Sequence, residues 1–481
     1  MIKITSGNQP WHIERHGMNR IPDTDKIGRP MDLFWIWFAA NIGILNVLYG
    51  GIIVSYQLSF LQSLLAAAIG SLSFVIVGIL SIAGRDGSAP MLSLSRAVFG
   101  VHGNLLPTIV SWINLLGWES VTVIIGTLSL EALLQAVLGI KTSVFVAVVS
   151  LVIFGGLVIA FGLLGQATLV VIQKIASWVF GLLTFGVIVL LLNGSEWNKV
   201  LMAPSGSWIS GFLPAVSIII AGTGISWGNV AADYSRYQPR TVKKRTIVMM
   251  VTLGSFIPVF ILMMVGVVLT NRSPGFATAV NPIAAIGDIL PKWMIIPYFV
   301  AAVGGMLAQA DLGLYSSGLN LLTMGVRTAR HKTIIIDAIV MLSITIYVLF
   351  IHQDFLGPFE SFMSLGGVGL AAWEAVFLVD QWILRKGIEY PSYCFDDGHQ
   401  GQIRWRQSVN GLALICWLLG MTMGMLFINS PLFNGPLAKG IFAGSNIGVL
   451  FAFLLSGILY SGILSYQYFV KSVRSDADLF D

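Results

Sequence analysis

Carboxyl groups within long apolar stretches are the side chains of this sequence most able to do chemistry. Glu119 directly follows Trp118 in INLLGWESVTVIIG, and Asp311 lies two residues after Gln309 in GMLAQADLGLYSSGLN. An ionisable group at membrane depth is costly, and it often marks a binding site or a proton pathway. We therefore predict that Glu119 and Asp311 bind a polar ligand or carry a proton. The alternative is that each one only holds neighbouring helices together.

The other intramembrane charges are assigned by their expected depth. Glu374 in AAWEAVFLVD and Lys174 after Gln173 either pair with other helices or lie near the inner face. Five further acidic residues are expected near a membrane surface and in contact with water: Asp233, Asp337 and Asp380 at the cytoplasmic surface, and Glu131 and Glu360 at the outer boundary. These residues are not part of the predicted site.

The tryptophans divide in the same way. Trp118 and Trp227 lie mid-span beside polar residues, whereas Trp35 and Trp37 resemble anchors at the membrane interface. Two indoles beside a polar cavity can hold a flat heteroaromatic ring, while carboxylates and amides bind its N–H and C=O edge. The alternative is that both tryptophans only pack between helices.

Residues 217–237, SIIIAGTGISWGNVAADYSRY, contain the element that must position these groups. The stretch begins as an apolar helix, loosens at 222–224 and 228–229, and ends in polar residues. Loosened backbone at membrane depth is tolerated only where it is buried in protein or lines a wet cavity. Transporters use such broken helices to hold a substrate, although glycines also allow close helix packing.

The composition indicates a polytopic membrane protein and excludes a soluble enzyme. Hydrophobic residues make up 56% of the chain and charged residues 10%. The polar first thirty residues do not resemble a signal peptide. Cys394 and Cys416 do not indicate a disulfide framework, and no nucleic-acid motif is present.

The apolar runs predict twelve membrane spans. Their expected bounds are 31–56, 57–83, 104–133, 143–163, 167–193, 209–233, 246–271, 293–325, 333–352, 356–384, 408–428 and 438–470. A loop with Arg85, Pro90 and Arg96 follows the second span, and 273–291 separates the seventh from the eighth. Residues 1–30 and 471–481 are expected to be cytoplasmic tails, and 385–406 an ordinary solvated cytoplasmic loop.

The basic residues support this count of spans. With the N-terminus inside, 21 of the 27 lysines and arginines fall on the cytoplasmic side and five on the outer side. Both termini are then cytoplasmic. The same asymmetry explains the net charge of +5 without a nucleic-acid partner.

Two of the predicted spans carry polar, glycine-marked interruptions. They lie at 41–51 in the first span and at 222–229 in the sixth. Because five spans separate them, the two halves have opposite orientations. We therefore predict an inverted repeat of 31–193 against 209–384, followed by two extra spans within 407–470. The broken ends of the first and sixth spans would face each other and supply polar groups to a central site.

Several segments together resemble one known family. The tail IERHGMNRIPDTD, the first-span IWFAANIGI, the loop GSAPMLSLSRAVFG, LGWESV and SWGNVAADYSRY are similar to the purine–cytosine permease branch of the nucleobase:cation symporter-1 family, over nearly the whole chain. The resemblance implies the all-α, leucine-transporter-like fold with twelve transmembrane helices, a five-plus-five inverted repeat and alternating access. It also implies cation-coupled uptake of a nucleobase or related heterocycle across the plasma membrane, without a cofactor.

The resemblance also implies a substrate site built from spans one, three, six and eight. Its members in this sequence are Asn41, Gly43, Trp118, Glu119, Ser226, Trp227, Gly228, Gln309 and Asp311. Trp227 is the expected stacking residue. Gly43 departs from the family, which has a polar side chain there, and neighbouring Asn41 is expected to take its role.

A cation site is implied between the first and eighth spans. It combines carbonyls at Ala39 and Ile42 with Gly305, Ala308 and Gln309. Sodium-coupled relatives have hydroxyl groups in the eighth span, whereas Ala308 offers only its backbone. One explanation is an alignment shifted to Ser316 or Ser317. The other, which we favour, is proton coupling with Asp311 or Glu119 as the carrier.

The leading hypothesis is a cation-coupled importer of purine or pyrimidine bases, with cytosine the first candidate. Hypoxanthine, adenine, allantoin and a thiamine-precursor pyrimidine fit equally. The rivals are an amino-acid or osmolyte symporter on the same fold, a membrane enzyme and a channel. The six histidines are scattered, and no HExxH motif is present, which argues against the enzyme. No nucleic-acid partner is expected, and the oligomeric state is left open.

Overall fold

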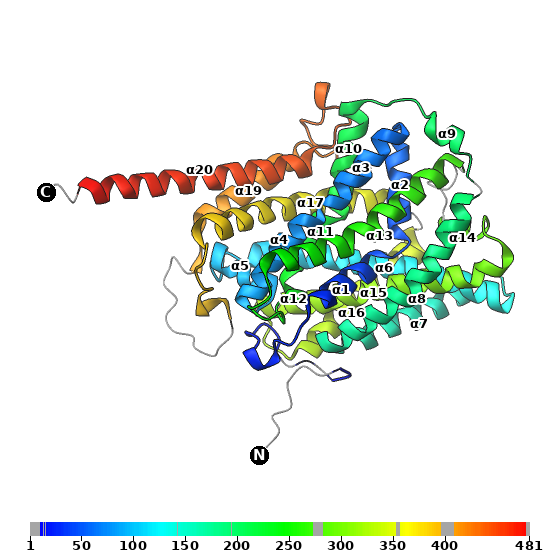
Figure 1. Cartoon of the computed structure of the whole chain (residues 1–481), viewed down its shortest axis with the longest axis horizontal. Helices are drawn as coiled ribbons and strands as arrows, with labels where there is room; N and C mark the ends of the chain where they lie inside the picture. The colour runs from blue at the N-terminus through cyan, green and yellow to red at the C-terminus, as the bar shows by residue number, and fades with distance from the viewer. Residues whose placement is uncertain are drawn as a thin grey trace, which may run out of the picture.

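The computed structural model describes residues 10–12, 14, 16–141, 143–193, 195–272, 282–352, 356–395 and 408–477. Within these ranges the chain is helical, apart from one isolated β-bridge between Asn429 and Asn434. Most of the long helices run along one common direction (Figure 1). Helix α20 projects beyond the end of the bundle that holds α5 and α12 (Figure 1).

The described residues contain ten helical spans long and apolar enough to cross a membrane, and a bent pair of helices forms an eleventh. The shorter apolar helix α19 completes the twelve predicted spans. In chain order the helices of these spans are α1 Pro30–Asn41, α2 Leu45–Ser55, α3 Phe60–Leu72, α4 Phe74–Gly87, α6 Leu105–Leu138, α7 Val144–Gly162, α8 Gln166–Asn193, α10 Leu213–Gly222, α11 Gly224–Gly228, α13 Lys244–Arg272, α15 Lys292–Thr323, α16 Arg330–Ile346, α17 Leu356–Val379, α19 Gly411–Met425 and α20 Gly448–Ala477.

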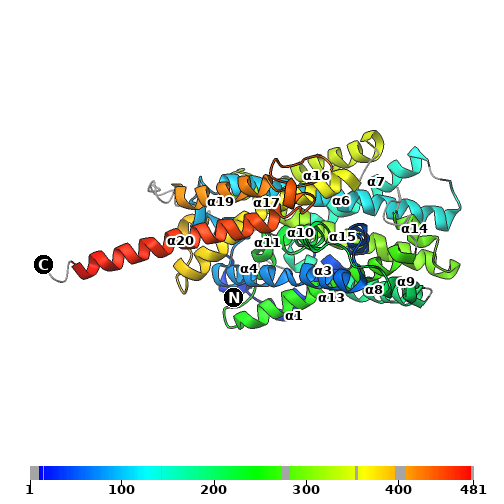
Figure 2. The same cartoon turned by 90° about the horizontal axis from the view of Figure 1, so that it is seen from above.

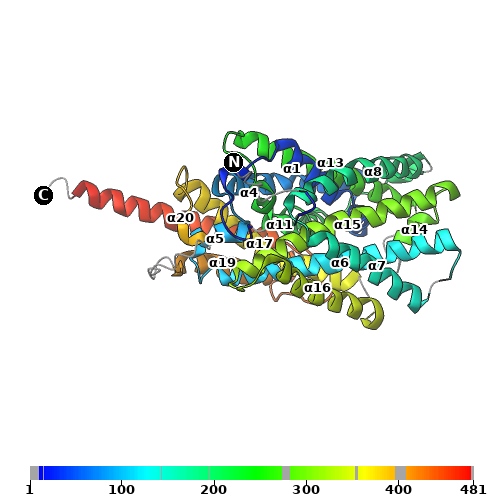
Figure 3. The same cartoon turned by 90° about the horizontal axis from the view of Figure 1, so that it is seen from below.

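Shorter helices connect the spans. They are α5 Met91–Phe99, α9 Trp197–Leu201, α12 Ala231–Ser235 and α14 Pro282–Gly287. Helices α1, α8 and α13 lie on one side of the bundle and α6, α7 and α16 on the other, with α10, α11 and α15 between them (Figures 2 and 3). The central layer therefore contains the sixth and eighth predicted spans.

Two of the expected segments differ from the structure. The expected loop around Arg85, Pro90 and Arg96 contains the helix α5, whose residues are all buried. Its polar residues bond inward, so that they resemble a loop in the sequence: Arg96 donates to the Thr323 carbonyl oxygen at 2.6 Å. The last span begins ten residues later than predicted, at Gly448. Its apolar part ends at Gln467, close to the predicted end at 470, and α20 continues as a helix to Ala477.

The predicted solvated loop at 385–406 is also only partly as expected. Tyr390 and Cys394 are buried, with 8% and 0% of their surface exposed. Burial is the main cause that raises the pKa of the Cys394 thiol, to about 12. Residues 396–406 lie outside the described part of the chain.

A buried carboxylate, that of Glu14, is one of the attachments of the N-terminal segment to the bundle. Glu14 is only 3% exposed, and its Oε1 lies 2.5 Å from a guanidinium nitrogen of Arg236. The hydroxyls of Tyr237 and Tyr315 donate to the same carboxylate at 2.6 and 2.9 Å, and the Gln166 backbone N–H donates at 3.1 Å. Glu14 thereby connects the segment to α8, to α15 and to the residues that follow α12.

The charge on Glu14 is stabilised by this set of partners. Burial by itself raises the pKa, but Arg236, Arg330 and the hydrogen bonds outweigh it and lower the pKa from 4.5 to about 2. The stabilisation is therefore fully present above pH 4.5, and it is lost only as the pH falls through about 2.

We predict that Glu14→Gln destabilises the protein by about 3–5 kcal/mol, because it leaves Arg236 buried without a counter-charge. The measurement is the thermal unfolding of the detergent-solubilised protein at neutral pH. Asp23→Asn is the matched control, because Asp23 is 93% exposed and bonds Lys26 where solvent screens the pair. Equal losses of stability in the two variants would contradict a stabilising buried ion pair at Glu14.

Candidate functional site

The first membrane span is broken between α1 and α2, which meet at an angle of 60°. A break frees backbone carbonyls that lipid cannot satisfy. Two asparagine amides satisfy them here: Asn41 Nδ2 donates to the Trp37 oxygen at 2.8 Å, and Asn46 Nδ2 donates to the Asn41 oxygen at 2.7 Å. The predicted interruption at 41–51 therefore exists, and polar side chains stabilise it from within.

The sixth span is broken at Thr223, between α10 and α11. Thr223 has φ −117° and ψ −105°, outside helical geometry. Its hydroxyl donates back to the Ile219 oxygen at 2.6 Å, and the Ser73 hydroxyl accepts the Gly224 N–H at 2.9 Å. Tyr49 of α2 donates to the Gly222 oxygen at 3.0 Å. The two breaks are therefore joined by a direct hydrogen bond from the first span to the sixth.

A cavity of about 270 Å³ lies between α6, α11 and α15. It is lined by Leu115, Trp118, Glu119, Thr122, Ser226, Trp227, Gln309 and Gly313. Five of these are residues assigned to the site from the sequence: Trp118, Glu119, Ser226, Trp227 and Gln309. The structure therefore brings these five together, and their role in binding stays a prediction.

The remaining lining residues follow from helix geometry. Leu115 and Thr122 share one face of α6 with Trp118 and Glu119, at spacings of three, four and seven residues. That spacing could have identified them from the sequence. Gly313 is needed for space, because a Cβ there would lie 2.9 Å from Glu119 Cγ.

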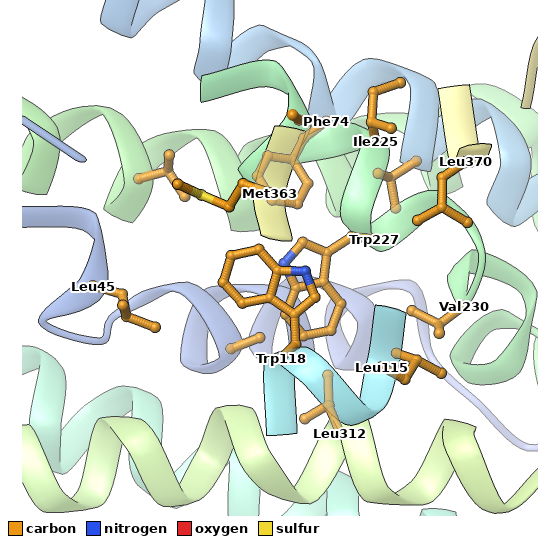
Figure 4. Packing of buried hydrophobic residues seen from close by; sticks show 14 of the residues in the cluster. Leu45, Phe74, Leu115, Trp118, Ile225, Trp227, Val230, Leu312, Met363 and Leu370 are labelled. Carbon is orange, nitrogen blue, oxygen red and sulfur yellow. The ribbon is translucent and has the colours of Figure 1, made fainter. Parts of the chain in front are cut away.

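The indoles of Trp118 on α6 and Trp227 on α11 both project toward this central space (Figure 4). The prediction that Trp37 is an interfacial anchor was wrong. It is fully buried, and its ring meets that of Trp227 edge to face with centroids 5.5 Å apart. Trp37 therefore supports the back of Trp227 and fixes its ring plane. Trp35 is half-buried and packs against Trp178.

Glu119 is the unusual group in the cavity. It is 1% exposed, and neither carboxyl oxygen makes a hydrogen bond among the described residues. The indole Nε1 of Trp118 is likewise buried without a partner. Buried polar atoms are nearly always paired, so this acceptor and this donor are available to a ligand.

Four predicted site residues do not line the cavity. The side chain of Asn41 donates instead to the Trp37 carbonyl, beside the break in the first span. Gly43 packs on α15, where a Cβ would lie 2.1 Å from Met306 Cε and 3.6 Å from Gln309 Oε1. Gly228 faces Glu374 instead, and a Cβ there would clash with that carboxyl. Asp311 is buried outside the cavity, and its Oδ2 has no hydrogen-bond partner among the described residues.

The predicted cation site has an apolar character. Ala39 of α1, Ala176 of α8 and Ala308 of α15 pack together in one small buried cluster. The Ala308 carbonyl accepts a hydrogen bond from Gln173 Nε2 at 2.8 Å. Gly305 lies against the break in the first span, where its Cβ would be 3.7 Å from the Ile42 oxygen. Apart from the amide of Gln309, the predicted residues contribute no side-chain oxygen, and their role in cation binding stays a prediction.

Three acidic residues expected to be solvated are buried, so that prediction was wrong. Asp233 is 1% exposed because its Oδ1 accepts the Met91 N–H at 2.7 Å and caps α5. Asp337 is fully buried and accepts a 2.6 Å hydrogen bond from Trp112 Nε1. Asp380 is 1% exposed and bonds Arg385 at 2.7 Å.

The remaining charged residues differ in their environments. Glu131 is 7% exposed, against the expectation of a solvated residue, and Glu360 is half-buried. Lys174 is exposed on the outer face of α8 and does not pair with a neighbouring helix. Glu374 is fully buried, and neither of its oxygens has a hydrogen-bond partner among the described residues.

Two broken helices around an enclosed polar and aromatic site define a secondary transporter of the leucine-transporter-like class. Residues 20–450 match the family of permeases for cytosine/purines, uracil, thiamine and allantoin, and the chain belongs to this family. The resemblance and the fold inferred from the sequence are thereby confirmed. The chain is a multi-pass membrane permease and not an enzyme.

Curated relatives agree with this assignment. The putative purine-cytosine permease YxlA of Bacillus subtilis is 26% identical over 470 residues, which cover 93% of this chain and 95% of that protein. Purine-cytosine permease fcyB of Emericella nidulans is 23% identical over 469 residues, covering 93% and 88%.

Two solved structures show the same fold. The nucleobase-cation-symport-1 family transporter Mhp1, in a closed conformation with bromovinylhydantoin bound, has a TM-score of 0.74 at 17% identity, with 96% of this chain and 95% of that chain covered. A Na⁺-coupled sialic acid symporter has a TM-score of 0.62 at 11% identity, covering 91% and 90%.

We predict that Ser73→Ala destabilises the protein by about 1–3 kcal/mol, because the Gly224 N–H at the break then loses its buried acceptor. The measurement is again the midpoint of thermal unfolding in detergent. Ser343→Ala is the control, because that exposed hydroxyl bonds only the Ile339 carbonyl one turn back in its own helix. A Ser73 variant as stable as the Ser343 variant would argue that the break does not need this hydroxyl.

Proposed function

We propose that the chain imports a nucleobase of the cytosine or purine type through the plasma membrane by alternating access, driven by a co-transported cation. The observation that carries this proposal is the cavity itself. It combines two indoles, one buried carboxyl without a partner and one primary amide. These are the groups that stack on a flat ring and bind its polar edge.

Each lining residue has a role in this proposal. Trp227 stacks on the base, and Trp118 covers it from α6 or donates from Nε1 to a ring carbonyl. Glu119 accepts hydrogen bonds from a ring N–H or an exocyclic amine, and Gln309 can both donate and accept.

Protons are the coupling ion that these residues favour. Sodium needs several oxygen ligands, whereas the Ala308 carbonyl is already bonded to Gln173 and the side chains of Ala39, Ala176 and Ala308 are methyl groups. Ser316 lies about 12 Å further along α15 and bonds Tyr234, so it does not replace the missing hydroxyl. Glu119 and Asp311 are the proton carriers proposed at the cavity and at the cation site.

The topology follows from the basic residues. With 21 of 27 lysines and arginines on one side, we propose that both termini are cytoplasmic. The end of the bundle that holds Glu14 and Arg236 would then be its cytoplasmic end.

The alternative function is symport of another small solute on the same fold, such as allantoin, a thiamine-precursor pyrimidine or an amino acid. The description of the family includes thiamine and allantoin beside cytosine, purines and uracil. A carboxylate substrate gives no reason for the unpaired Glu119 beside Trp118, and the nucleobase is therefore preferred.

The test is uptake of radiolabelled cytosine into proteoliposomes under an imposed proton gradient or an imposed sodium gradient. Unlabelled purines serve as competitors. We expect accumulation driven by the proton gradient and inhibited by a purine. Absence of both uptake and binding for every base would overturn the nucleobase assignment, and accumulation driven by sodium alone would overturn proton coupling.

We predict that Trp227→Ala weakens cytosine binding about 5- to 150-fold, the equivalent of about 1–3 kcal/mol of lost stacking. The measurement is equilibrium binding to the purified protein. Trp293→Ala is the control, because Trp293 is 69% exposed and distant in sequence from the lining residues of α15. An unchanged affinity in the Trp227 variant would remove this residue from the base site.

We also predict that Glu119→Gln weakens cytosine binding about 10- to 150-fold, because a charged hydrogen-bond acceptor contributes about 1.5–3 kcal/mol. The variant should still be inserted in the membrane, since a glutamine fits the same space. The control is Glu360→Gln, a half-buried carboxyl outside the cavity. Full binding and transport by the Glu119 variant would show that Glu119 does not contact the substrate.

A further inference from the structure

A second carboxyl without a partner is buried behind the sixth span, outside the cavity. Glu374 of α17 is 0% exposed, and neither of its oxygens makes a hydrogen bond among the described residues. It is not one of the residues that line the cavity with Glu119. Buried polar atoms are nearly always paired, and an ionisable group at membrane depth often marks a functional site. Glu374 is therefore a candidate for a function that the base site does not use.

The carboxyl of Glu374 is directed at the residue where α11 ends. A Cβ on Gly228 would lie 2.6 Å from the carboxyl carbon of Glu374 and 2.9 Å from Leu80 Cδ1 of α4, so the glycine makes room for this side chain. Gly228 directly follows Trp227, whose indole projects toward the base cavity. Glu374 therefore contacts the sixth span one residue after the proposed stacking residue.

The sixth span is interrupted again beside this contact. Helix α11 ends at Gly228, and two residues separate it from α12. The second of them, Val230, has φ −122° and ψ 1°, outside helical geometry. Residues at the ends of short elements are those that absorb changes of backbone angle in domain motions. Helix α11 can therefore change its position relative to α17 without bending a long helix.

Hydrogen bonds connect α17 to α5 and α19. Trp373, which precedes Glu374, donates from Nε1 to the Ser95 hydroxyl of α5 at 2.9 Å. The Gly369 oxygen of α17 accepts from Trp417 Nε1 of α19 at 3.0 Å. Helix α17 also packs on α11, where the carboxyl of Glu374 meets a glycine without bonding it. The two helices can therefore separate at this contact without breaking a hydrogen bond of the carboxyl.

The charged groups on the elements that pack against α17, and on α4 behind Leu80, have other partners. They are Arg96 of α5 with the Thr323 oxygen, Asp380 with Arg385 and Tyr460, Arg85 with Asp86, and Glu131 of α6 with Gln135. Glu119 of α6 lines the cavity. Helices α10, α11 and α19 contain no Asp, Glu, Lys, Arg or His, and Cys416 is the titratable group of α19. Within the described residues, Glu374 therefore has no counter-ion.

The neutral acid is the form of Glu374 that fits this closed arrangement. A charge in a dry interior, without a counter-ion or hydrogen bonds, costs several kcal/mol, and a buried carboxyl avoids this cost by holding a proton. When water reaches the carboxyl, the cost disappears and the ionised form is favoured again, because a hydrated glutamate ionises near pH 4. Protonation of Glu374 is therefore linked to its contact with α11.

We propose that Glu374 is a proton-binding site of the transport cycle, occupied while α17 lies against Gly228 and emptied when the two separate. This inference rests on the proposed function, and it adds a third site to Glu119 and Asp311. On separation, the O–H bond of Glu374 breaks and its proton passes to a water molecule, which leaves a hydrated carboxylate. The contact forms again only after the carboxylate has taken a proton from water. One proton therefore moves with each closing and opening of this contact.

The position of Glu374 indicates the side on which the proton is released. Glu374 lies five residues before the end of α17, or about 8 Å along the axis. The chain continues from that end to Tyr390, whose oxygen accepts from Arg20 of the N-terminal segment at 3.2 Å. In the topology proposed above this is the cytoplasmic end. A proton released there enters the cell, in the same direction as the base.

The test compares three activities of Glu374→Gln in proteoliposomes with those of the parent protein. They are cytosine binding, exchange of labelled for unlabelled cytosine without gradients, and accumulation driven by a proton gradient with proton uptake followed by an internal pH dye. Because glutamine imitates the neutral acid, we expect binding and exchange within about threefold of the parent protein, while accumulation and substrate-dependent proton uptake fall about tenfold or more. Glu374→Asp, which restores an acid, should recover part of the accumulation.

Glu131→Gln is the matched control, because it makes the same substitution at another carboxyl within a span. Glu131 of α6 is 7% exposed, and its Oε1 accepts from Gln135 Nε2 at 3.5 Å. Proton-driven accumulation should persist in this variant.

A pair of variants tests the contact itself. Gly228→Ala should lower exchange about tenfold or more, because the new Cβ clashes with the carboxyl of Glu374. Combining Gly228→Ala with Glu374→Ala removes the clash, so exchange should return to within about threefold of the parent protein while proton-driven accumulation stays low. A double variant that does not recover exchange would overturn the contact on which the proposal depends.

The failure of this proposal can be distinguished from that of the proposed function. Normal proton-driven accumulation in Glu374→Gln would overturn the proton site while leaving the proposed function intact. Loss of binding and exchange together with accumulation would make Glu374 a structural residue and would also overturn the proton site. If the parent protein itself neither binds nor accumulates a base, the proposed function fails first.

Discussion

The requirement that every buried backbone group be satisfied is the constraint on which the structure depends. Two spans are interrupted near mid-depth, and each interruption exposes carbonyls or N–H groups that lipid cannot bond. Ser73 and Tyr49 from other spans satisfy them at the sixth span, whereas Asn46 of the same span does so at the first. Because the partners of the sixth span come from other spans, its break can exist only in the assembled bundle. The cavity is the space that this assembly encloses.

The same constraint extends beyond the breaks. Ser111 of α6 accepts hydrogen bonds from Asn229 after α11 at 2.8 Å and from Asn320 of α15 at 2.7 Å. The hydroxyl of Ser111 thus joins the third, sixth and eighth spans. Any motion that separates these spans must break both bonds and leave two amides without an acceptor, unless water enters. A motion that separates these three spans is therefore coupled to the entry of water between them.

The sequence was most informative where a motif carries the family resemblance. Trp118 and Glu119 in LGWESV and Ser226 and Trp227 in SWGNV were assigned to the site on that resemblance, and they line one cavity. Trp37 was misassigned because a tryptophan near the start of a span usually marks the interface. The span that carries Trp37 runs through the interior, and hydropathy does not distinguish a lipid-facing helix from a central one.

The wrong prediction that two aspartates contact water has a related cause. Asp233 and Asp337 lie within two helical turns of a span end, where a sequence predicts contact with water. A short helix covers the first, and a tryptophan of another span covers the second. These are tertiary contacts, and no local pattern in the sequence predicts them. The residues that could have been found are Leu115 and Thr122, whose helical spacing from Trp118 and Glu119 was sufficient.

The ion pair between Glu14 and Arg236 has a consequence for how the N-terminal segment responds to its surroundings. With a pKa of about 2, Glu14 remains charged at every pH that a cell experiences. The ion pair therefore has the same strength in acidic and alkaline surroundings, and a change of pH does not weaken it. Its strength should respond instead to temperature and to penetrating water, since the cost of separating two buried ions is set by their hydration.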